Sequence, residues 1–142
     1  MKKVKLQIEH SYDFELLGLV SPVRDYKMAW LINREMNLNL IRTEDLEIEF
    51  LSVPNLKISQ YFLSLPHGYI QLLKNKALSS SRQVSYLIPE LKYMDYFLLL
   101  QDETYQIDSQ LFVSELSKNP YIQNVIKLDV NKLKSKENLL TY

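Results

Sequence analysis

The segment of residues 88–96, with the sequence IPELKYMDY, holds the side chains best suited to chemistry. Pro89 has no backbone N–H and interrupts strand pairing, so the residues after it are expected to turn the chain. Glu90 and Asp95 would then stand near opposite ends of the turn, with Tyr93 and Tyr96 beside them. A carboxylate whose pKa is raised by burial can act as a general base, and a tyrosine hydroxyl can orient a substrate. These four residues define a candidate carboxylate–tyrosine site of a small-molecule-binding protein or an enzyme.

A structural interpretation of the same carboxylates competes with the catalytic one. Glu90 and Asp95 can accept hydrogen bonds from backbone N–H groups around a bend, or pair with Lys92 or Arg82. No activated nucleophile, metal ligand set or phosphate-binding loop accompanies them in the sequence. We therefore favour the structural interpretation and assign no catalytic residue.

The segment also resembles the signature of the IPExxxVDY family, small bacterial proteins known mainly from Bacteroidetes. Met94 stands where the family name has valine, which exchanges one apolar side chain for another. Asp25 with Tyr26 and the late segment 133–139 extend the resemblance over most of the chain. The residues that match the signature itself are Ile88, Pro89, Glu90, Asp95 and Tyr96. The resemblance implies an uncharacterised family without assigned activity, so it implies no catalytic residue and no cofactor.

Composition excludes several kinds of chemistry. The chain of 142 residues contains no cysteine, which excludes thiol catalysis, cysteine-based metal sites and disulfides. Its only glycines are Gly18 and Gly68, too few for a Walker A loop or a dinucleotide-binding fingerprint. His10 and His67 are the only histidines and give little basis for a metal site. We therefore expect no cofactor and no metal, and a length typical of a single domain, residues 1–142.

The charge distribution argues against a nucleic-acid-binding protein. The 17 basic and 17 acidic residues balance, so the chain lacks the overall positive field of such proteins. Lysines do gather at both ends of the chain, and the two ends together would make a modest basic patch. The lysines concerned are Lys2, Lys3, Lys5, Lys127, Lys132, Lys134 and Lys136. Weak nucleic-acid binding through these termini is a third alternative, although lysine-rich ends more often only keep a chain soluble.

The sequence shows no membrane or export signal. No uncharged apolar run approaches the roughly 20 residues that span a bilayer. The first residues resemble the basic start of a signal peptide, but Gln7, Glu9 and His10 interrupt any apolar stretch after it. We expect a cytoplasmic protein without a membrane partner.

Hydrophobic periodicity predicts an α+β fold. Alternating or continuous apolar runs predict strands over 4–8, 14–20, 38–40, 46–50, 57–65, 69–73, 84–88, 94–100 and 121–128. Pro66-His67-Gly68 indicates a hairpin turn. Two helices are expected, at about 22–36 and 108–118. Runs of strands between isolated helices predict a mostly antiparallel sheet of five to seven strands, with both helices packed on one face.

The helix at 22–36 is expected to begin with Ser21 as its N-cap and Pro22 at the first helical position. Its buried face is predicted to contain Val23, Tyr26, Ala29, Trp30, Ile32 and Met36. Asn33 falls within that apolar face, where its amide would need a hydrogen-bond partner.

Ten tyrosines suggest a role in binding other proteins, because tyrosine suits surfaces that are half buried and half wet. Five lie in the β-rich middle of the chain: Tyr61, Tyr69, Tyr86, Tyr93 and Tyr96. If several point outward they form a docking surface; the alternative is that they fill the core. Edge strands of the sheet would also invite a partner strand. The leading hypothesis is a non-enzymatic protein-interaction or scaffolding domain, which includes the case of a homodimer.

Overall fold

The computed structural model describes residues 13–48, 56–78, 84–104 and 106–139. In these ranges one sheet has six strands: β1 (Glu15–Val20), β2 (Ile41–Arg42), β5 (Gln60–Leu65), β6 (Gly68–Lys74), β7 (Tyr96–Asp102) and β8 (Asn124–Leu128). A second sheet pairs β3 (Leu46–Ile48) with β4 (Leu56–Ile58). The two α-helices are α2 (Asp25–Met36) and α3 (Ser109–Ser117).

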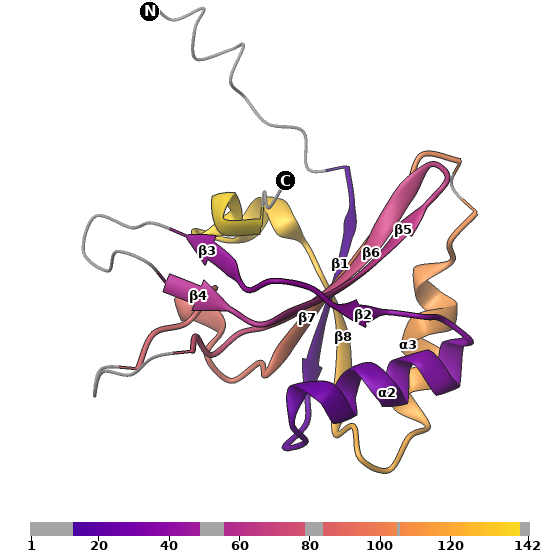
Figure 1. Ribbon diagram of the computed structural model, residues 1–142, viewed down its shortest axis with the longest axis horizontal. Coiled ribbons are helices and arrows are strands. Elements are labelled where there is room, and N and C mark those ends of the chain that lie inside the picture. Colours follow the sequence, from indigo (N-terminus) through magenta and orange to yellow (C-terminus); the bar gives the residue numbers. More distant parts are fainter. Residues whose placement is uncertain (1–12, 49–55, 79–83, 105, 140–142) are drawn as a thin grey trace, which may run out of the picture.

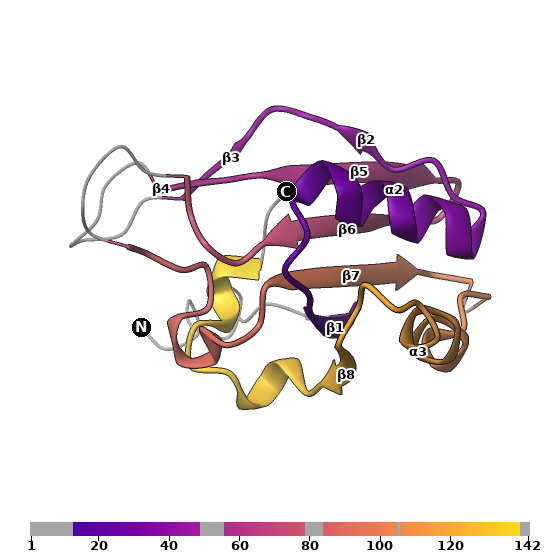
Figure 2. The same ribbon diagram turned by 90° about the horizontal axis from the view of Figure 1, so that it is seen from below.

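The six-stranded sheet has the order β2-β5-β6-β7-β1-β8, and every neighbouring pair is antiparallel. Figure 2 shows this order from β2 at the top to β8 at the bottom. The mostly antiparallel α+β fold predicted from the sequence is therefore confirmed. The hairpin at Pro66 and His67 is confirmed as well, because Leu65 pairs with Gly68 across this turn.

Both helices cover the same face of the sheet, as predicted (Figure 1). Their buried side chains, including Met28 and Ile32 of α2 and Phe112 of α3, share one apolar core with the strands. The strand residues in this core include Leu17, Leu19, Ile70, Leu72, Tyr96, Leu98 and Leu100. Asp108 caps α3 as a side-chain acceptor for the backbone N–H of Gln110.

The opposite face is covered by β4, by short 3-10 turns and by irregular chain, with no α-helix among the described residues. Its core joins strand residues such as Leu73 and Leu99 to Ile88 and Met94 before β7, and to Val130 after β8. Since both faces are covered, the first five residues of β7 are all buried, as expected of a central strand.

Three predicted strands differ from the structure. The predicted strand 57–65 is two strands, β4 and β5, which are separated at Ser59. The strand expected at 38–40 starts later, as the two-residue β2. Residues 84–88 form no strand, and only Tyr86 makes an isolated bridge, to Lys76. The backbone N–H groups of Leu87 and Ile88 donate to Asn75 instead of to a neighbouring strand. The strand predicted at 4–8 lies outside the described residues.

Helix α2 begins later than predicted, because Ser21 does not cap it. The Ser21 hydroxyl donates to the carbonyl of Tyr121 at 2.6 Å, and its backbone N–H donates to the Asp95 carboxylate. The N-cap position is instead occupied by Arg24, which makes no side-chain capping bond.

The predicted buried face of α2 was also wrong for its two largest side chains. Tyr26 is 63% exposed and Trp30 is 52% exposed, whereas Met28 and Leu31 are fully buried. The buried stripe is centred near Met28, and Trp30 lies about 200° around the helix from it at 100° per residue. The prediction for Asn33 is confirmed, because its amide bonds both backbone groups of Leu40.

The two glycines allow a direct test of how tightly the strands pack. A methyl group on Gly68 would overlap the backbone carbonyl of Gln101 in β7, which cannot move without breaking the sheet. A methyl group on Gly18 would meet Met94 and Leu128, whose flexible side-chain ends can shift. We expect Gly68→Ala to lower the free energy of unfolding by at least about 3 kcal/mol and Gly18→Ala by about 1 kcal/mol. Urea unfolding of both variants measures this, and equal losses would contradict the packing described here.

Candidate functional site

The segment of residues 88–96 is shaped by the buried amide of Asn75, at the end of β6. The side-chain oxygen of Asn75 accepts from the N–H of Ile88 at 2.9 Å, and its nitrogen donates to the carbonyls of Leu91 and Met94, both at 2.9 Å. The Asn75 backbone adds two further bonds, to the carbonyl of Asp95 and from the N–H of Leu87. Asn75 is completely buried, so these bonds replace water at every polar group it has.

Between the residues that Asn75 bonds, the chain turns through a short 3-10 helix, η1 (Pro89–Leu91). Proline begins it, where a missing N–H costs nothing. The N–H groups of Leu91 and Met94 bond the carbonyls three residues before them. Glu90 and Tyr93 therefore project from the outer side of a fixed turn, and both are exposed.

Glu90 is held by the C-terminal part of the chain. Its two carboxylate oxygens accept from the backbone N–H and the hydroxyl of Ser135, each at 2.8 Å. Partial burial acts to raise the pKa of Glu90, but the hydrogen bonds from Ser135 and nearby backbone amides outweigh it and lower the pKa. A general base with a raised pKa requires the opposite shift.

Asp95 and Tyr96 are also bonded to backbone groups. Asp95 accepts from the N–H of Ser21 at 2.8 Å, and the Tyr96 hydroxyl donates to the carbonyl of Val23 at 2.6 Å. Burial raises the pKa of Tyr96, and the negative charges of Asp25 and Asp95 raise it further. Both side chains fasten the chain between β1 and α2 to the start of β7.

The four predicted site residues therefore do not converge. Glu90 contacts Ser135, Asp95 contacts Ser21, and the Tyr93 side chain is 61% exposed. As the structural interpretation expects, both carboxylates accept hydrogen bonds from backbone N–H groups. The donors differ from those expected. Their backbone donors come from distant parts of the chain instead of from the bend itself.

A cavity of about 330 Å³ lies beside this segment and contains two of the four residues, Asp95 and Tyr96. The rest of its lining was not predicted: Ser21, Pro22, Val23, Lys74, Lys76, Tyr86, Lys92 and Met94. Lys92 lies 18 positions after Lys74 and 16 after Lys76, so the fold is needed to bring Lys92 to the other two.

A second candidate site lies on the solvent side of α2. We call Tyr26, Lys27, Trp30, Arg34 and Tyr121 the α2 surface. The Lys27 ammonium lies 4.7 Å from the Tyr121 ring and 5.9 Å from the Trp30 ring, and the Arg34 guanidinium lies 4.9 Å from the Trp30 ring. These are cation–π distances. The sequence analysis missed this surface because it placed Tyr26 and Trp30 in the core.

The five tyrosines of the β-rich middle do not make a docking surface. Tyr61 and Tyr96 are buried on the helix-covered face, and Tyr69 stacks on Phe62 on the other face at 5.5 Å between ring centroids. Core filling accounts for these three, whereas Tyr86 is half-buried and Tyr93 is exposed. The aromatic side chains that do cluster at the surface come from α2 and from Tyr121.

The remaining predicted features contribute no site in the described ranges. His67 is exposed at the hairpin tip, and His10 lies outside these ranges. Of the terminal lysines, Lys127 pairs with Glu15 at 3.2 Å, while the first three lie outside the described residues. The basic-terminus hypothesis therefore stays a prediction. No helix in the described part of the chain has the length and apolar character needed to cross a bilayer.

Comparison of the chain with protein-family models, with curated proteins and with solved structures found no match. The resemblance to the IPExxxVDY family rests on the residues quoted above and stays a prediction. The candidate sites must therefore be judged on their own geometry.

The hydrogen bonds of Glu90 predict an acid-dependent contribution to stability. Because folding lowers its pKa, ionised Glu90 stabilises the protein above the ordinary glutamate value of 4.5, and this contribution is lost as the pH falls through the lowered pKa. We expect Glu90→Gln to cost about 1 kcal/mol at pH 7, after allowance for solvent screening, and less at pH 3. Urea unfolding at both pH values measures the difference. A Glu137→Gln control should show no such loss, and an equal loss at both pH values for Glu90→Gln would contradict the assignment.

Proposed function

We propose that the protein is a non-enzymatic interaction domain that binds an acidic segment of a partner protein through the α2 surface. The observation that supports this proposal is the set of exposed aromatic rings with cations held over two of them. A cytoplasmic location and membership of the IPExxxVDY family are parts of the same proposal.

The residue types of the α2 surface are those that dominate binding energy at protein interfaces. Tryptophan, tyrosine and arginine are enriched among interface residues whose truncation to alanine weakens binding by about 2 kcal/mol or more. Trp30 and Tyr121 are each 52% exposed, so both keep a large apolar area in water. Tyr26 and Arg34 lie four residues before and after Trp30, which places all three along one stripe of the helix.

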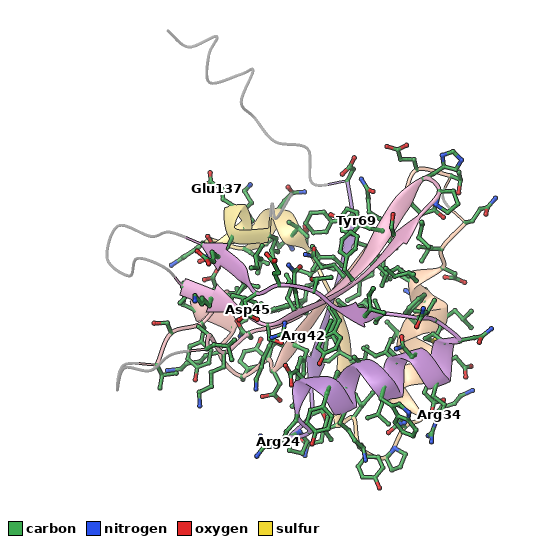
Figure 3. The ribbon with its side chains drawn as sticks, viewed as in Figure 1. Arg24, Arg34, Arg42, Asp45, Tyr69 and Glu137 are labelled. Carbon is green, nitrogen blue, oxygen red and sulfur yellow. The ribbon has the colours of Figure 1, made fainter. Side chains whose placement is uncertain are left out.

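The charge of this surface favours an acidic partner. Lys27 and Arg34 of this surface and the adjacent Arg24 supply three positive charges, and Figure 3 shows Arg24 and Arg34 near opposite ends of α2. Asp25 and Glu35 on the same helix offset two of these charges, and three minus two leaves a net charge of +1. Asp25 bonds the Ser59 hydroxyl, and Glu35 bonds Arg34 and Asn119. A segment that carries aspartate or glutamate beside apolar side chains complements this arrangement.

A single-stranded nucleic acid would also suit basic and aromatic residues, but the ring geometry favours a protein. Bases bind such surfaces by stacking on open ring faces. Lys27 and Arg34 already lie over Trp30, and Lys27 also lies over Tyr121, so a stacking base would have to displace these cations.

The enzymatic alternative has weaker support. Glu90 and Asp95 are both tied to backbone N–H groups, and Glu90 does not line the cavity that contains Asp95. Tyr93 is 61% exposed, and its hydroxyl makes no hydrogen bond to another described residue.

Peptide selection on the purified protein tests the proposal. Peptides enriched from a random display library are synthesised, and their dissociation constants are measured by fluorescence anisotropy. We expect acidic sequences with apolar side chains, binding that weakens with salt, and a loss of about 30-fold for Trp30→Ala. Circular dichroism should show that this variant folds, because Trp30 is half exposed.

Tyr93→Ala is the matched control, since Tyr93 is an exposed aromatic residue outside the α2 surface. It should bind the selected peptides as the wild type does. Failure to enrich any peptide, equal losses for the two variants, self-association through α2 in place of peptide binding, or tighter binding of oligo(dT) at this surface would each contradict the proposal.

A further inference from the structure

The cavity beside residues 88–96 has the size of a small-molecule site. It lies between the Ser21–Val23 connection, the end of β6 and the chain leading into β7, and its volume is about 330 Å³. Ligand pockets commonly measure about 300–1,000 Å³, so this one suits a small ligand. The cavity and the α2 surface have no residue in common.

The cavity is strongly positive. Lys74, Lys76 and Lys92 all line it, and Asp95 is the only carboxylate among the described residues that do. None of the three ammonium groups forms an ion pair or hydrogen bond with another described residue. The lining therefore carries a formal charge of about +2 at neutral pH, from three lysines and one aspartate.

The backbones that carry these lysines are fixed. Lys74 pairs with Tyr96 in the sheet, and Lys76 forms a bridge with Tyr86. Lys92 directly follows η1, whose path is set by the Asn75 amide. Asp95 offsets only one of the three positive charges around the cavity, so a net repulsion remains that an anionic ligand would relieve.

We propose that this cavity binds the phosphoryl group of a small phosphate monoester. Such a group carries close to −2 at pH 7, which matches the charge of the lining. Lysine is a common phosphate ligand and acts as a point charge that needs no exact orientation. The Asp95 oxygen that does not bond Ser21, together with the Tyr86 hydroxyl, can bond a hydroxyl group elsewhere on the ligand.

Calorimetric titration of the full chain tests this proposal. The probes are inorganic phosphate, ribose 5-phosphate, glycerol 3-phosphate and AMP, with ribose as the uncharged comparison. We expect saturable binding of at least one phosphate compound, weaker binding at high salt, and no binding of ribose. Lys76→Met and Lys92→Met should each weaken binding about tenfold, because each removes a charged contact.

Lys132→Met is the matched control, because Lys132 is exposed and does not line the cavity. It should bind the phosphate compounds as the wild type does. Both cavity lysines are themselves exposed, so their variants are expected to fold, and circular dichroism checks this. The proposal is overturned if no phosphate compound binds, if Lys76→Met and Lys92→Met bind normally, or if Lys132→Met loses affinity to the same extent.

Discussion

The buried side-chain amide of Asn75 is the interaction on which the irregular half of this structure depends. Five hydrogen bonds connect its side chain and backbone to residues 87–95, which have almost no regular secondary structure. Each buried polar group left without a partner here would lower the free energy of unfolding by about 1–3 kcal/mol. Residues 87–95 are therefore anchored mainly by the polar groups of Asn75, and Asn138 adds one further bond, to the carbonyl of Leu87.

This anchoring places the groups around the cavity and connects them to the rest of the fold. Lys92 and Asp95 take their positions from the turn that Asn75 holds. Asp95 then bonds the N–H of Ser21, and the Ser21 hydroxyl bonds the carbonyl of Tyr121, one of the α2 surface residues. A continuous hydrogen-bonded path thus joins the lysine-lined cavity to the chain that follows α3. The two proposed sites have no residue in common, but both are connected to this hydrogen-bonded path.

The sequence predicted those features that depend on local pattern. The α+β fold, the helices on one face and the hairpin at Pro66 all follow from periodicity or turn chemistry. The features it missed depend on contacts between distant residues. In the sequence Asn75 looks like any other polar residue, because its partners are not visible there. Lys92 lies 16 to 18 positions from the other two lysines of the cavity. Trp30 was misplaced because aromatic residues suit a core and an interface equally.

The most direct test of this account compares two asparagines by urea unfolding. Asn75→Ala removes three buried side-chain bonds, whereas Asn138→Ala removes one, to the carbonyl of Leu87. We expect Asn138→Ala to lower the free energy of unfolding by about 1 kcal/mol, and Asn75→Ala to lower it by at least about 3 kcal/mol or to prevent folding. Losses that agree within about 0.5 kcal/mol would contradict the central role of Asn75.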